Sequence, residues 1–434
     1  MLYFNIQNFR VFKEDTILDM RAKKRLLKYK ENLIDQNFIT KTKTKSINLI
    51  PYAVIFGGNA SGKSSIIKAL DLLKDIVIDG RIYSDNRNET LFNLGLYPFL
   101  HNYEDYLSPM KLSIGFISNN IRYDYSVKIK CKLREEYFYA DRKICEEQLF
   151  INEQEVFHRT NQSVEFEGTI KSIGTLPEDE HISNDELFLN ARFKTGKYYQ
   201  DYQNIVNWFR FKLIVLNNVS EIITYIESNN LIKQNKKIRS HATDLTKNIS
   251  DFGPQSIFYE INSNSNGVVS ELRSRYAISG HPCGGIETSA DNTESTGTIK
   301  FVNIIGLLID ALRLGNTVVI DELDSSLHFA LIKKIVNLFA RQSTNIGKGQ
   351  LIFTSHNPVF ISLTKIRRDQ IYFVEKDNKT FASSLYSLSD FPSEDVRTSE
   401  AFIKNYLDGK YGAQPSFDFE GEIEKIINTK RDNQ

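Results

Sequence analysis

The stretch "GGNASGKSS", residues 57–65, constrains the fold of this chain more than any other segment. It fits the pattern G-x-x-x-x-G-K-[ST], a loop whose backbone N–H groups surround nucleotide phosphates. The apolar run "YAVIF" precedes the loop, and "IIKALDLLKDIVI" follows it with the spacing of a helix. A strand before such a loop and a helix after it are the context that the pattern requires. The segment therefore predicts an α/β nucleotide-binding fold.

The residue types in this loop suit phosphate binding. Gly57 and Gly62 let the backbone turn its N–H groups toward phosphates, and the helix that begins here adds its positive dipole end. Lys63 is predicted to reach the β- and γ-phosphates, and the Ser64 hydroxyl is predicted to ligate Mg²⁺. ATP and Mg²⁺ are thus the expected cofactors. The predicted nucleotide-binding residues of the loop are Gly57, Gly58, Asn59, Ala60, Ser61, Gly62, Lys63, Ser64 and Ser65.

Two further apolar runs end in polar residues. In "TVVIDELDSSLH", residues 317–328, a buried strand is predicted to place Asp321 where it can hold Mg²⁺ through Ser64 and water. Glu322 would then face the γ-phosphate as the general base. In "QLIFTSHNP", residues 350–358, His356 could hydrogen-bond the γ-phosphate, although a histidine at a strand end can also be structural.

The segment "ESTGTIKFVNIIGLLIDAL", residues 294–312, reads as a long apolar helix with Ser295, Thr296 and Gly297 at its start. The simplest interpretation is that Ser295 caps the helix. The same groups, a small hydroxyl and free N–H groups at a helix start, can also bind an anion. The residues alone leave both interpretations open.

Composition is that of a globular protein, with 41% hydrophobic and 25% charged residues among 434. No apolar run has the roughly 18 residues of a membrane span, and the N-terminus does not read as a signal peptide. The three cysteines, Cys131, Cys145 and Cys283, form no C-x-x-C pair, so we expect no metal or disulfide role and a cytoplasmic location.

A net charge of +1 gives no global attraction to nucleic acid. A local basic stretch, "RAKKRLLKYK" at 21–30, is followed by "KTKTK" at 41–45. It can be a solvated face, or it can contact nucleic acid or another partner.

The coarse order of elements indicates an α/β protein. Residues 1–20 predict two strands, and the alternation over 111–170 predicts antiparallel hairpins. From about 184 the pattern turns helical, whereas 260–294 is rich in Gly, Ser and Asn and predicts loops. Residues 295–376 predict three helices that alternate with three strands. The predicted domains are an N-terminal ATPase lobe with an antiparallel β subdomain (1–183), a helical insert and loop (184–290), and a C-terminal ATPase lobe (291–434).

The motifs, in this order, resemble those of ABC-type ATPases of the RecF, SMC and OLD group. "NFRVFKED" near the start, with Arg10, resembles the N-terminal strand of those proteins. The chain is similar above all to bacterial AAA-type ATP-binding proteins of abortive-infection and anti-phage systems, such as RloA, AbiLi and the AriA subunit of PARIS. Four segments carry this likeness: "GGNASGKSS", "ESTGTIK", "DELDSSLH" and "YLDGKYGAQP".

The resemblance implies an ABC-type head with a mixed sheet, an antiparallel β subdomain and an inserted helical subdomain. It implies that Ser295 and Gly297 occupy the ABC signature position and that Asp324 belongs to the D-loop. The signature serine of one subunit then completes the site of another, so a homodimer or a higher homo-oligomer is expected. Phe329 stands where the family often has proline, and Gln148 is one candidate for the Q-loop, with no match as the alternative.

The function that the resemblance implies is an ATPase that senses infection and controls a separate effector, a toxin or a nuclease encoded nearby. The sequence contains no H-N-H pattern and no TOPRIM-like Glu followed by D-x-D, which disfavours a nuclease in the same chain. The alternatives are a RecF-like or SMC-like ATPase that binds DNA, and a scaffold whose ATP site turns over slowly. No membrane association is expected.

Overall fold

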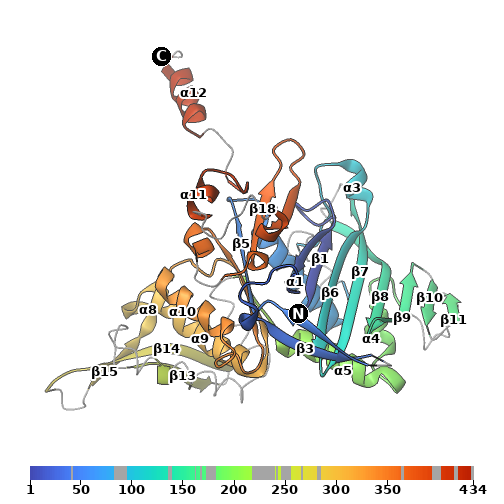
Figure 1. The fold of residues 1–434 in the computed structure, drawn as a ribbon, viewed down its shortest axis with the longest axis horizontal. Coiled ribbons are helices and arrows are strands. Elements are labelled where there is room, and N and C mark those ends of the chain that lie inside the picture. The colour runs from blue at the N-terminus through green and yellow to red at the C-terminus, as the bar shows by residue number, and fades with distance from the viewer. Residues whose placement is uncertain are drawn as a thin grey trace.

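The strand that precedes the phosphate loop lies at the centre of a six-stranded mixed sheet (Figure 1). In this computed structural model five neighbouring strands run parallel, and β19 pairs antiparallel at one edge. Parallel strands present their carboxyl ends at one edge of a sheet, where ligands of such sheets bind. In spatial order the strands are β12 (Leu213–Leu216), β16 (Thr317–Ile320), β17 (Gln350–Ser355), β5 (Tyr52–Gly57), β18 (Ile371–Lys376) and β19 (Ser383–Ser387).

A second, eight-stranded sheet is antiparallel throughout. In spatial order its strands are β11 (Thr169–Ser172), β10 (Ser163–Phe166), β9 (Gln154–Thr160), β8 (Tyr139–Ile151), β7 (Ile121–Arg134), β6 (Met110–Ser118), β1 (Tyr3–Gln7) and β2 (Thr16–Asp19). In β7 and β9 buried side chains alternate with more exposed ones, the pattern of a sheet covered on one face, whereas five consecutive residues of β6 are buried.

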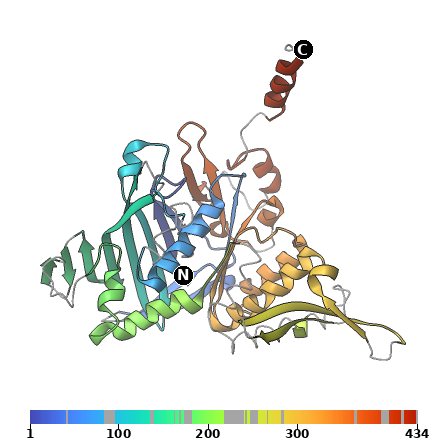
Figure 2. The same ribbon diagram turned by 180° about the vertical axis from the view of Figure 1, so that it is seen from behind.

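Helix α1 (Lys63–Asp79) lies between the two sheets, as both ribbon views show (Figures 1 and 2). Its apolar side chains, among them Ile67 and Leu70, belong to a core that also contains Phe4 of β1 and Ile55 of β5. The helix that begins at the phosphate loop is therefore fixed on two sides, which holds its N-terminus in one place relative to both sheets.

The other face of the mixed sheet is covered by α9 (Thr296–Leu314) and α10 (Phe329–Ala340). Successive side chains of β5 serve the two cores in turn: Ala53 and Ile55 face α1, whereas Val54 and Phe56 face the core of α9 and α10. A strand buried on both faces reads as a continuous apolar run, which is why "YAVIF" carries no polar residue.

Shorter elements complete the chain, and α12 extends away from the body in both views. The other helices are α3 (Tyr103–Leu107), α4 (Phe188–Arg192), α5 (Tyr199–Asn207), α8 (Ala290–Thr293), α11 (Phe402–Leu407) and α12 (Phe419–Arg431). The remaining strands are β3 (Ile34–Ile39), β4 (Thr44–Leu49), β13 (Ser256–Asn264), β14 (Gly267–Ala277) and β15 (Gly285–Ser289). A π-helix covers Trp208–Lys212, and 3-10 helices cover Lys30–Asn32, Gly196–Tyr198, Pro358–Ser362, Arg368–Gln370 and Leu388–Asp390.

The described part of the chain comprises residues 1–40, 43–82, 95–134, 139–161, 163–166, 169–172, 182–217, 240, 243–245, 256–264, 267–280, 285–362, 366–392, 402–414 and 419–431. Within these ranges, no helix has both the length and the apolar character needed to cross a bilayer. Cys131 and Cys145 are free thiols, and Cys283 lies outside the described residues.

The predicted fold class, α/β with a mixed sheet and an antiparallel β subdomain, is confirmed. The strands at the N-terminus, the hairpins of 111–170 and the helix after the phosphate loop are present as expected. The mixed sheet takes strands from all three predicted domains, because β5, β12 and β16 come from different ones.

Three expectations about elements were wrong. Residues 213–216 form β12 instead of continuing a helix, because a short apolar run buried on both faces has no period that separates strand from helix. The predicted loop over 260–294 contains the sheet β13-β14-β15, in which Ser and Asn occupy strand positions. Between β17 and β18 the described residues form 3-10 helices in place of an α-helix. The helical pattern of 219–234 lies outside the described residues.

Candidate nucleotide-binding site

The phosphate loop leaves β5 at the carboxyl edge of the mixed sheet and enters α1. Two of its residues have left-handed backbone angles, Ala60 with φ 59° and Gly62 with φ 116°. A Cβ atom on Gly57 would lie 2.5 Å from the Val374 carbonyl oxygen, and one on Gly62 would lie 2.7 Å from the Val11 side chain. Close packing therefore requires glycine at both positions, and the backbone conformation requires it at Gly62 as well.

Lys63 turns its side chain back over the loop. Its Nζ donates to the carbonyl oxygens of Gly57 at 2.8 Å and Gly58 at 2.9 Å, and the residue is 5% exposed. Burial lowers the pKa of the Lys63 ammonium, and the nearby carboxylates of Asp321 and Glu322 act in the opposite direction. The structure thus brings the predicted phosphate lysine and the predicted acidic pair to the same site.

Neighbouring segments support the loop from behind. Ser383 of β19 donates its hydroxyl to the Ser61 carbonyl oxygen at 2.6 Å and its backbone N–H to the Val11 carbonyl oxygen at 2.7 Å. The hydroxyl of Ser61 is buried and has no hydrogen-bond partner within the described residues. A buried polar atom of this kind, at the centre of a loop that fits phosphate, can be satisfied by a bound ligand.

Thr354, at the end of β17, links the two predicted acidic residues. Its hydroxyl donates to Oδ1 of Asp321 at 2.5 Å and accepts the backbone N–H of Glu322 at 2.7 Å. Glu322 has φ 49°, a left-handed conformation that costs a residue with a side chain about 1–3 kcal/mol. The contact from Thr354 holds Glu322 in this conformation from the amide side.

Lys300 of α9 holds the same turn from the carbonyl side. Its Nζ donates to the backbone oxygens of Glu322 at 2.6 Å and Ser325 at 2.9 Å. Burial lowers the pKa of the Lys300 ammonium, while the Asp324 and Glu322 carboxylates oppose this effect. A Cβ atom on Gly297 would lie 2.2 Å from the Ser326 carbonyl oxygen, so the start of α9 touches the turn that follows Glu322.

His356 and Glu322 are neighbours at the solvent-facing side of the site. His356 Nε2 lies 3.7 Å from Glu322 Oε1, and the two side chains are 40% and 55% exposed. Asp324, predicted from the D-loop resemblance, accepts the Ser355 hydroxyl at 2.7 Å and the backbone N–H groups of His356 and Asn357 at 3.1 and 3.2 Å. Within this chain Asp324 therefore fixes the strand end that carries His356.

Ser295 is the N-cap of α9. Its hydroxyl accepts the backbone N–H of Thr298 at 3.2 Å and lies 3.0 Å from the Thr298 hydroxyl. The simplest interpretation of this serine is thus confirmed. The capping hydroxyl is exposed to solvent at the start of the helix.

The remaining predicted residues separate into those near the loop and those away from it. Ser64 and Ser65 lie in the first turn of α1, and Asn59 and Ala60 are exposed at the tip of the loop. Gln148 lies in β8 of the antiparallel sheet, where its side chain donates to Glu155 at 2.5 Å. This contact turns the Gln148 amide toward β9.

Two other residues that the resemblance singled out have local packing roles. Arg10 lies next to Val11, which packs behind Gly62, and its Nε donates to the Gly95 carbonyl oxygen at 3.0 Å. Phe329 is the first residue of α10, a position that also suits proline, and its ring lies 4.9 Å from that of Phe360.

The C-terminal segment that contributed to the resemblance packs beside the loop. The ring centroid of Tyr406 lies 6.0 Å from that of Phe56, the residue before Gly57, and 5.6 Å from that of Phe373. Tyr411 stacks on Phe373 at 5.8 Å. The two tyrosines therefore support the strands from which the phosphate loop projects.

Sequence reasoning missed three residues that shape the site: Lys300, Thr354 and Ser383. Thr354 stands two positions before His356, in the apolar run "QLIFTSH", and a hydroxyl there is the one signal that could have indicated it. Lys300 and Ser383 come from segments 22 and 322 residues away from their partners, so no local pattern points to them.

A phosphate loop between a buried strand and a helix, with paired carboxylates at the end of a nearby parallel strand, defines a P-loop nucleotide-binding domain. The particular family follows from the sequence comparison. Residues 53–362, more than half of the chain, match the family described as "AAA domain, putative AbiEii toxin, Type IV TA system", and the chain belongs to that family.

The comparisons with solved structures and with curated proteins do not narrow the family further. The SMC head domain from Thermotoga maritima is a similar solved structure, with 11% sequence identity, a TM-score of 0.36, and coverage of 89% of this chain and 97% of that one. No curated protein sequence matches the chain.

Proposed function

We propose that this protein is a Mg²⁺-dependent ATPase. The observation that carries the proposal is the hydroxyl of Thr354, which joins Asp321 and Glu322 beside the buried ammonium of Lys63. Membership of an AAA family supports ATP as the nucleotide. The loop N–H groups and Lys63 would hold the phosphates, and Ser64 with Asp321 would hold Mg²⁺, which neutralises charge on the phosphates when it is bound.

The residues of this chain divide the chemistry between them. Glu322 is exposed and has its backbone fixed on both sides, so it can take a proton from an attacking water as general base. His356, 3.7 Å from the Glu322 carboxylate, is placed to hydrogen-bond the γ-phosphate or the same water. Lys63 would exchange its contacts with the Gly57 and Gly58 carbonyl oxygens for contacts with phosphate.

We further propose that two copies meet head to tail, so that Ser295 of one copy completes the phosphate site of the other. The exposed N-terminus of α9, with its small hydroxyl, supports this assembly, because a helix start favours an anion. Gly297 and Lys300 fix this helix start to the turn after Glu322. Ser295 and Glu322 of one copy would then move together, although they belong to two different nucleotide sites.

The biological role proposed for this assembly is sensing and regulation in anti-phage defence, with a separate toxin or nuclease as effector. The family description, which names a putative AbiEii toxin and a type IV TA system, supports a link to toxin systems, and the separate effector is proposed from the motif resemblance. The alternative, a RecF-like ATPase that binds DNA along the basic stretch, receives less support. Within that stretch Arg21 is paired with Asp19 and Lys23 with Asp390, which leaves less free positive charge for a duplex.

Two substitutions test the ATPase proposal. Lys63→Ala should abolish ATP binding in calorimetry, because it removes the cation that faces the phosphates. Glu322→Gln should retain binding but lower the hydrolysis rate by about 10²- to 10⁴-fold, because the carboxamide cannot accept the proton.

Lys68→Ala is the matched control, because Lys68 lies on the same helix with an exposed side chain. The control should bind and hydrolyse ATP as the parent does. Parent affinity in Lys63→Ala, or the parent hydrolysis rate in Glu322→Gln, would contradict the assignment of these residues.

A further inference from the structure

A pocket lies at the opposite end of the parallel strands from the phosphate loop. It has a volume of about 650 Å³ and lies between the segment after β2, the β3–β4 hairpin, β7 and the start of β18. Arg367 of this pocket precedes β18, whereas the phosphate loop follows the end of β5, which is parallel to β18. The pocket and the phosphate loop are thus at opposite ends of the strands, and the proposed ATPase mechanism does not use this pocket.

Basic side chains outnumber acidic ones in the walls of this pocket, here called the basic pocket, although Arg21, Lys23 and Arg367 are each paired with a carboxylate. Of the described residues that line it, seven are basic and Glu153 alone is acidic. The basic ones are Arg21, Lys23, Lys24, Lys30, Lys45, Arg122 and Arg367. They come from four segments of the chain, so the fold itself gathers this charge.

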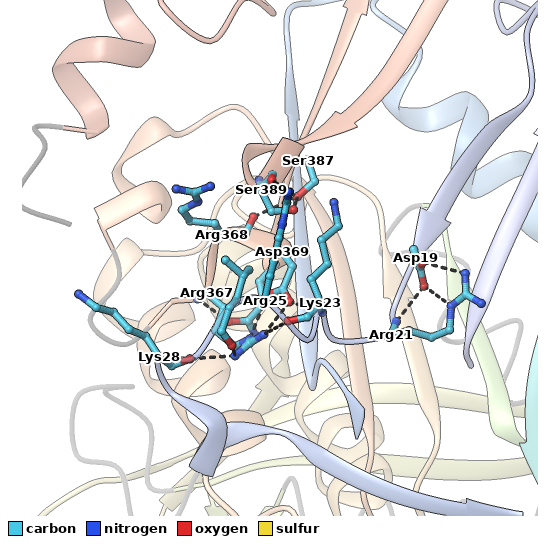
Figure 3. A network of polar contacts seen from close by, with 12 residues as sticks. Asp19, Arg21, Lys23, Arg25, Lys28, Arg367, Arg368, Asp369, Ser387 and Ser389 are labelled. Atoms are coloured by element: carbon cyan, nitrogen blue, oxygen red, sulfur yellow. Dashed lines mark hydrogen bonds and ion pairs between the residues drawn. The ribbon is translucent and has the colours of Figure 1, made fainter. Parts of the chain in front are cut away.

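A buried ion pair fixes the backbone of the basic stretch at 21–30 (Figure 3). Arg367 donates to both carboxylate oxygens of Asp369, at 3.0 and 2.8 Å, and the two side chains are almost fully buried. The same guanidinium donates to the carbonyl oxygens of Leu26 at 3.1 Å and Lys28 at 2.8 Å, and Asp369 accepts the backbone N–H of Lys23 at 2.9 Å. The segment is therefore preorganised, which lowers the entropy cost of binding.

Two cations of the basic pocket are available to a ligand. Lys24 and Lys30 are exposed, and within the described residues neither ammonium has an ion pair or a hydrogen bond. Lys45 and Arg122 share Glu153, and Arg122 is also paired with Asp124 at 2.8 Å. An anion with more charge than one carboxylate can compete with Glu153 for both cations.

The floor of the basic pocket is apolar, with Ala22, Leu26, Leu33 and Ile47. The ring of Phe38 is covered, because Lys45 Nζ and Arg122 Cζ lie 6.0 and 5.7 Å from its centroid. The pocket thus combines a cationic rim with an aliphatic floor, and its volume falls in the range of about 300–1,000 Å³ that is typical of small-molecule sites.

We propose that the basic pocket binds the phosphate groups of a nucleotide, either a free nucleotide or the phosphorylated end of a nucleic-acid strand. A chain of phosphates places several negative charges within a few ångströms, which matches the exposed lysines of the stretch 21–30 that line the pocket, together with Lys45 and Arg122, around one small volume. The aliphatic floor suits the base or the sugar. Recognition inside a pocket of this size favours a single nucleotide unit over the side of a duplex.

The test uses the full chain with Lys63→Ala, so that the phosphate loop does not take up the probe. Calorimetry with inorganic tripolyphosphate should show binding that weakens as salt is added. Lys24→Ala combined with Lys30→Ala should weaken this binding by about tenfold or more, because two charge-assisted contacts are lost.

Lys28→Ala is the matched control: Lys28 belongs to the same segment and is exposed, yet it does not line the basic pocket. Figure 3 shows its side chain directed away from Arg367. Affinity within about twofold of the parent is expected here. No binding of tripolyphosphate, unchanged binding in the double variant, or an equal loss in Lys28→Ala would overturn the proposal, and none of these results bears on ATP hydrolysis at Lys63.

Two further probes, in the same Lys63→Ala chain, identify the source of the phosphates. Tighter binding of ATP than of tripolyphosphate supports a free nucleotide, and tighter binding of a 5′-phosphorylated single strand than of its 5′-hydroxyl form supports a strand end. Poly-glutamate that binds as tightly as tripolyphosphate would overturn the assignment to phosphate. A blunt duplex without terminal phosphates that binds as tightly as the phosphorylated strand would overturn recognition within the pocket.

Discussion

Thr354 is the residue on which the geometry of the acidic pair depends most directly. One hydroxyl fixes the Asp321 carboxylate and the Glu322 amide at once, although Glu322 has an unfavourable backbone conformation. A hydroxyl that both donates and accepts couples the orientation of the two groups. The Thr354 hydroxyl can therefore position both residues, Asp321 for its proposed role as metal ligand and Glu322 for its proposed role as base.

We predict that Thr354→Val lowers the turnover number for ATP by about 10- to 100-fold, because a misplaced base loses most of its effect. The KM for ATP should stay within about threefold of the parent value, since the phosphate loop is unchanged. Steady-state hydrolysis at saturating Mg²⁺ measures both quantities.

Thr317→Val is the control for stability. Thr317 is a buried threonine at the other end of the neighbouring strand β16, where its hydroxyl lies 3.3 Å from Gln350 Oε1. Each substitution removes buried hydrogen bonds and should cost about 1–3 kcal/mol of folding free energy. Normal turnover in Thr354→Val, or an equal loss in Thr317→Val, would exclude a positioning role for Thr354.

At the scale of elements, Glu147 joins the antiparallel sheet to helix α4. Its carboxylate accepts the backbone N–H groups of Phe188 at 2.6 Å and Leu189 at 3.1 Å, at the start of that helix. Glu147 lies 3.8 Å from Arg159, and both side chains are fully buried. Burial raises the pKa of Glu147, and Arg159 together with the two N–H groups acts to lower it. Removal of either residue would leave the charge of the other buried without compensation, which strongly destabilises a fold.

Glu147→Ala should therefore destabilise the protein by about 3–5 kcal/mol, because it leaves the Arg159 guanidinium buried without its carboxylate. Glu146→Ala, at the preceding position, removes a partly exposed carboxylate that is paired with Lys128 and should cost about 1 kcal/mol or less. Urea unfolding followed by circular dichroism measures both. Similar unfolding midpoints for the two variants would show that the buried pair does not stabilise the junction.

Elements with a clear period were predictable from the sequence. Three segments combine a regular spacing of apolar residues with a motif, turn or cap signal. They are the helix that follows the loop of Gly57 to Ser65, the hairpins of 111–170 and the long helix from Thr296. β12 was not predictable, because its four apolar residues fit a strand and a helix equally well. β14 mixes Ser, Glu and Arg with Val, Leu and Tyr, and the Gly, Ser and Asn content of the surrounding stretch assigned it to a loop.

The residues of the site also divide into those that the sequence predicts and those that it does not. Lys63, Asp321, Glu322 and His356 were predictable, since each stands at a motif position at the end of a strand or the start of a helix. The support from Lys300 was not predictable, because a lysine within an apolar helix gives no sign of the backbone oxygens that it meets after folding. Tertiary contacts of this kind appear only with the fold.

At the scale of the whole molecule, the proposed assembly depends on Ser295. This serine caps α9 in its own chain, so a change here has two effects that must be separated. Ser295→Ala removes the cap, at a cost of about 0.5–2 kcal/mol, and leaves room for a facing phosphate. Ser295→Arg also removes the cap but adds a bulky side chain. We predict that both variants bind ATP through the intact loop and that Ser295→Arg alone loses ATP-dependent association.

Mixed subunits test the head-to-tail arrangement itself. Ser295→Arg and Lys63→Ala should each be inactive alone, because every pair of identical subunits then carries the same fault in both sites. In a mixed pair one site takes Lys63 from the first variant and Ser295 from the second, and so has neither fault. If one intact site can turn over, mixing should restore hydrolysis to at most about half of the parent rate, because each mixed pair has one working site of two. Full hydrolysis by Ser295→Arg alone would mean that Ser295 only caps its helix and that each subunit works independently.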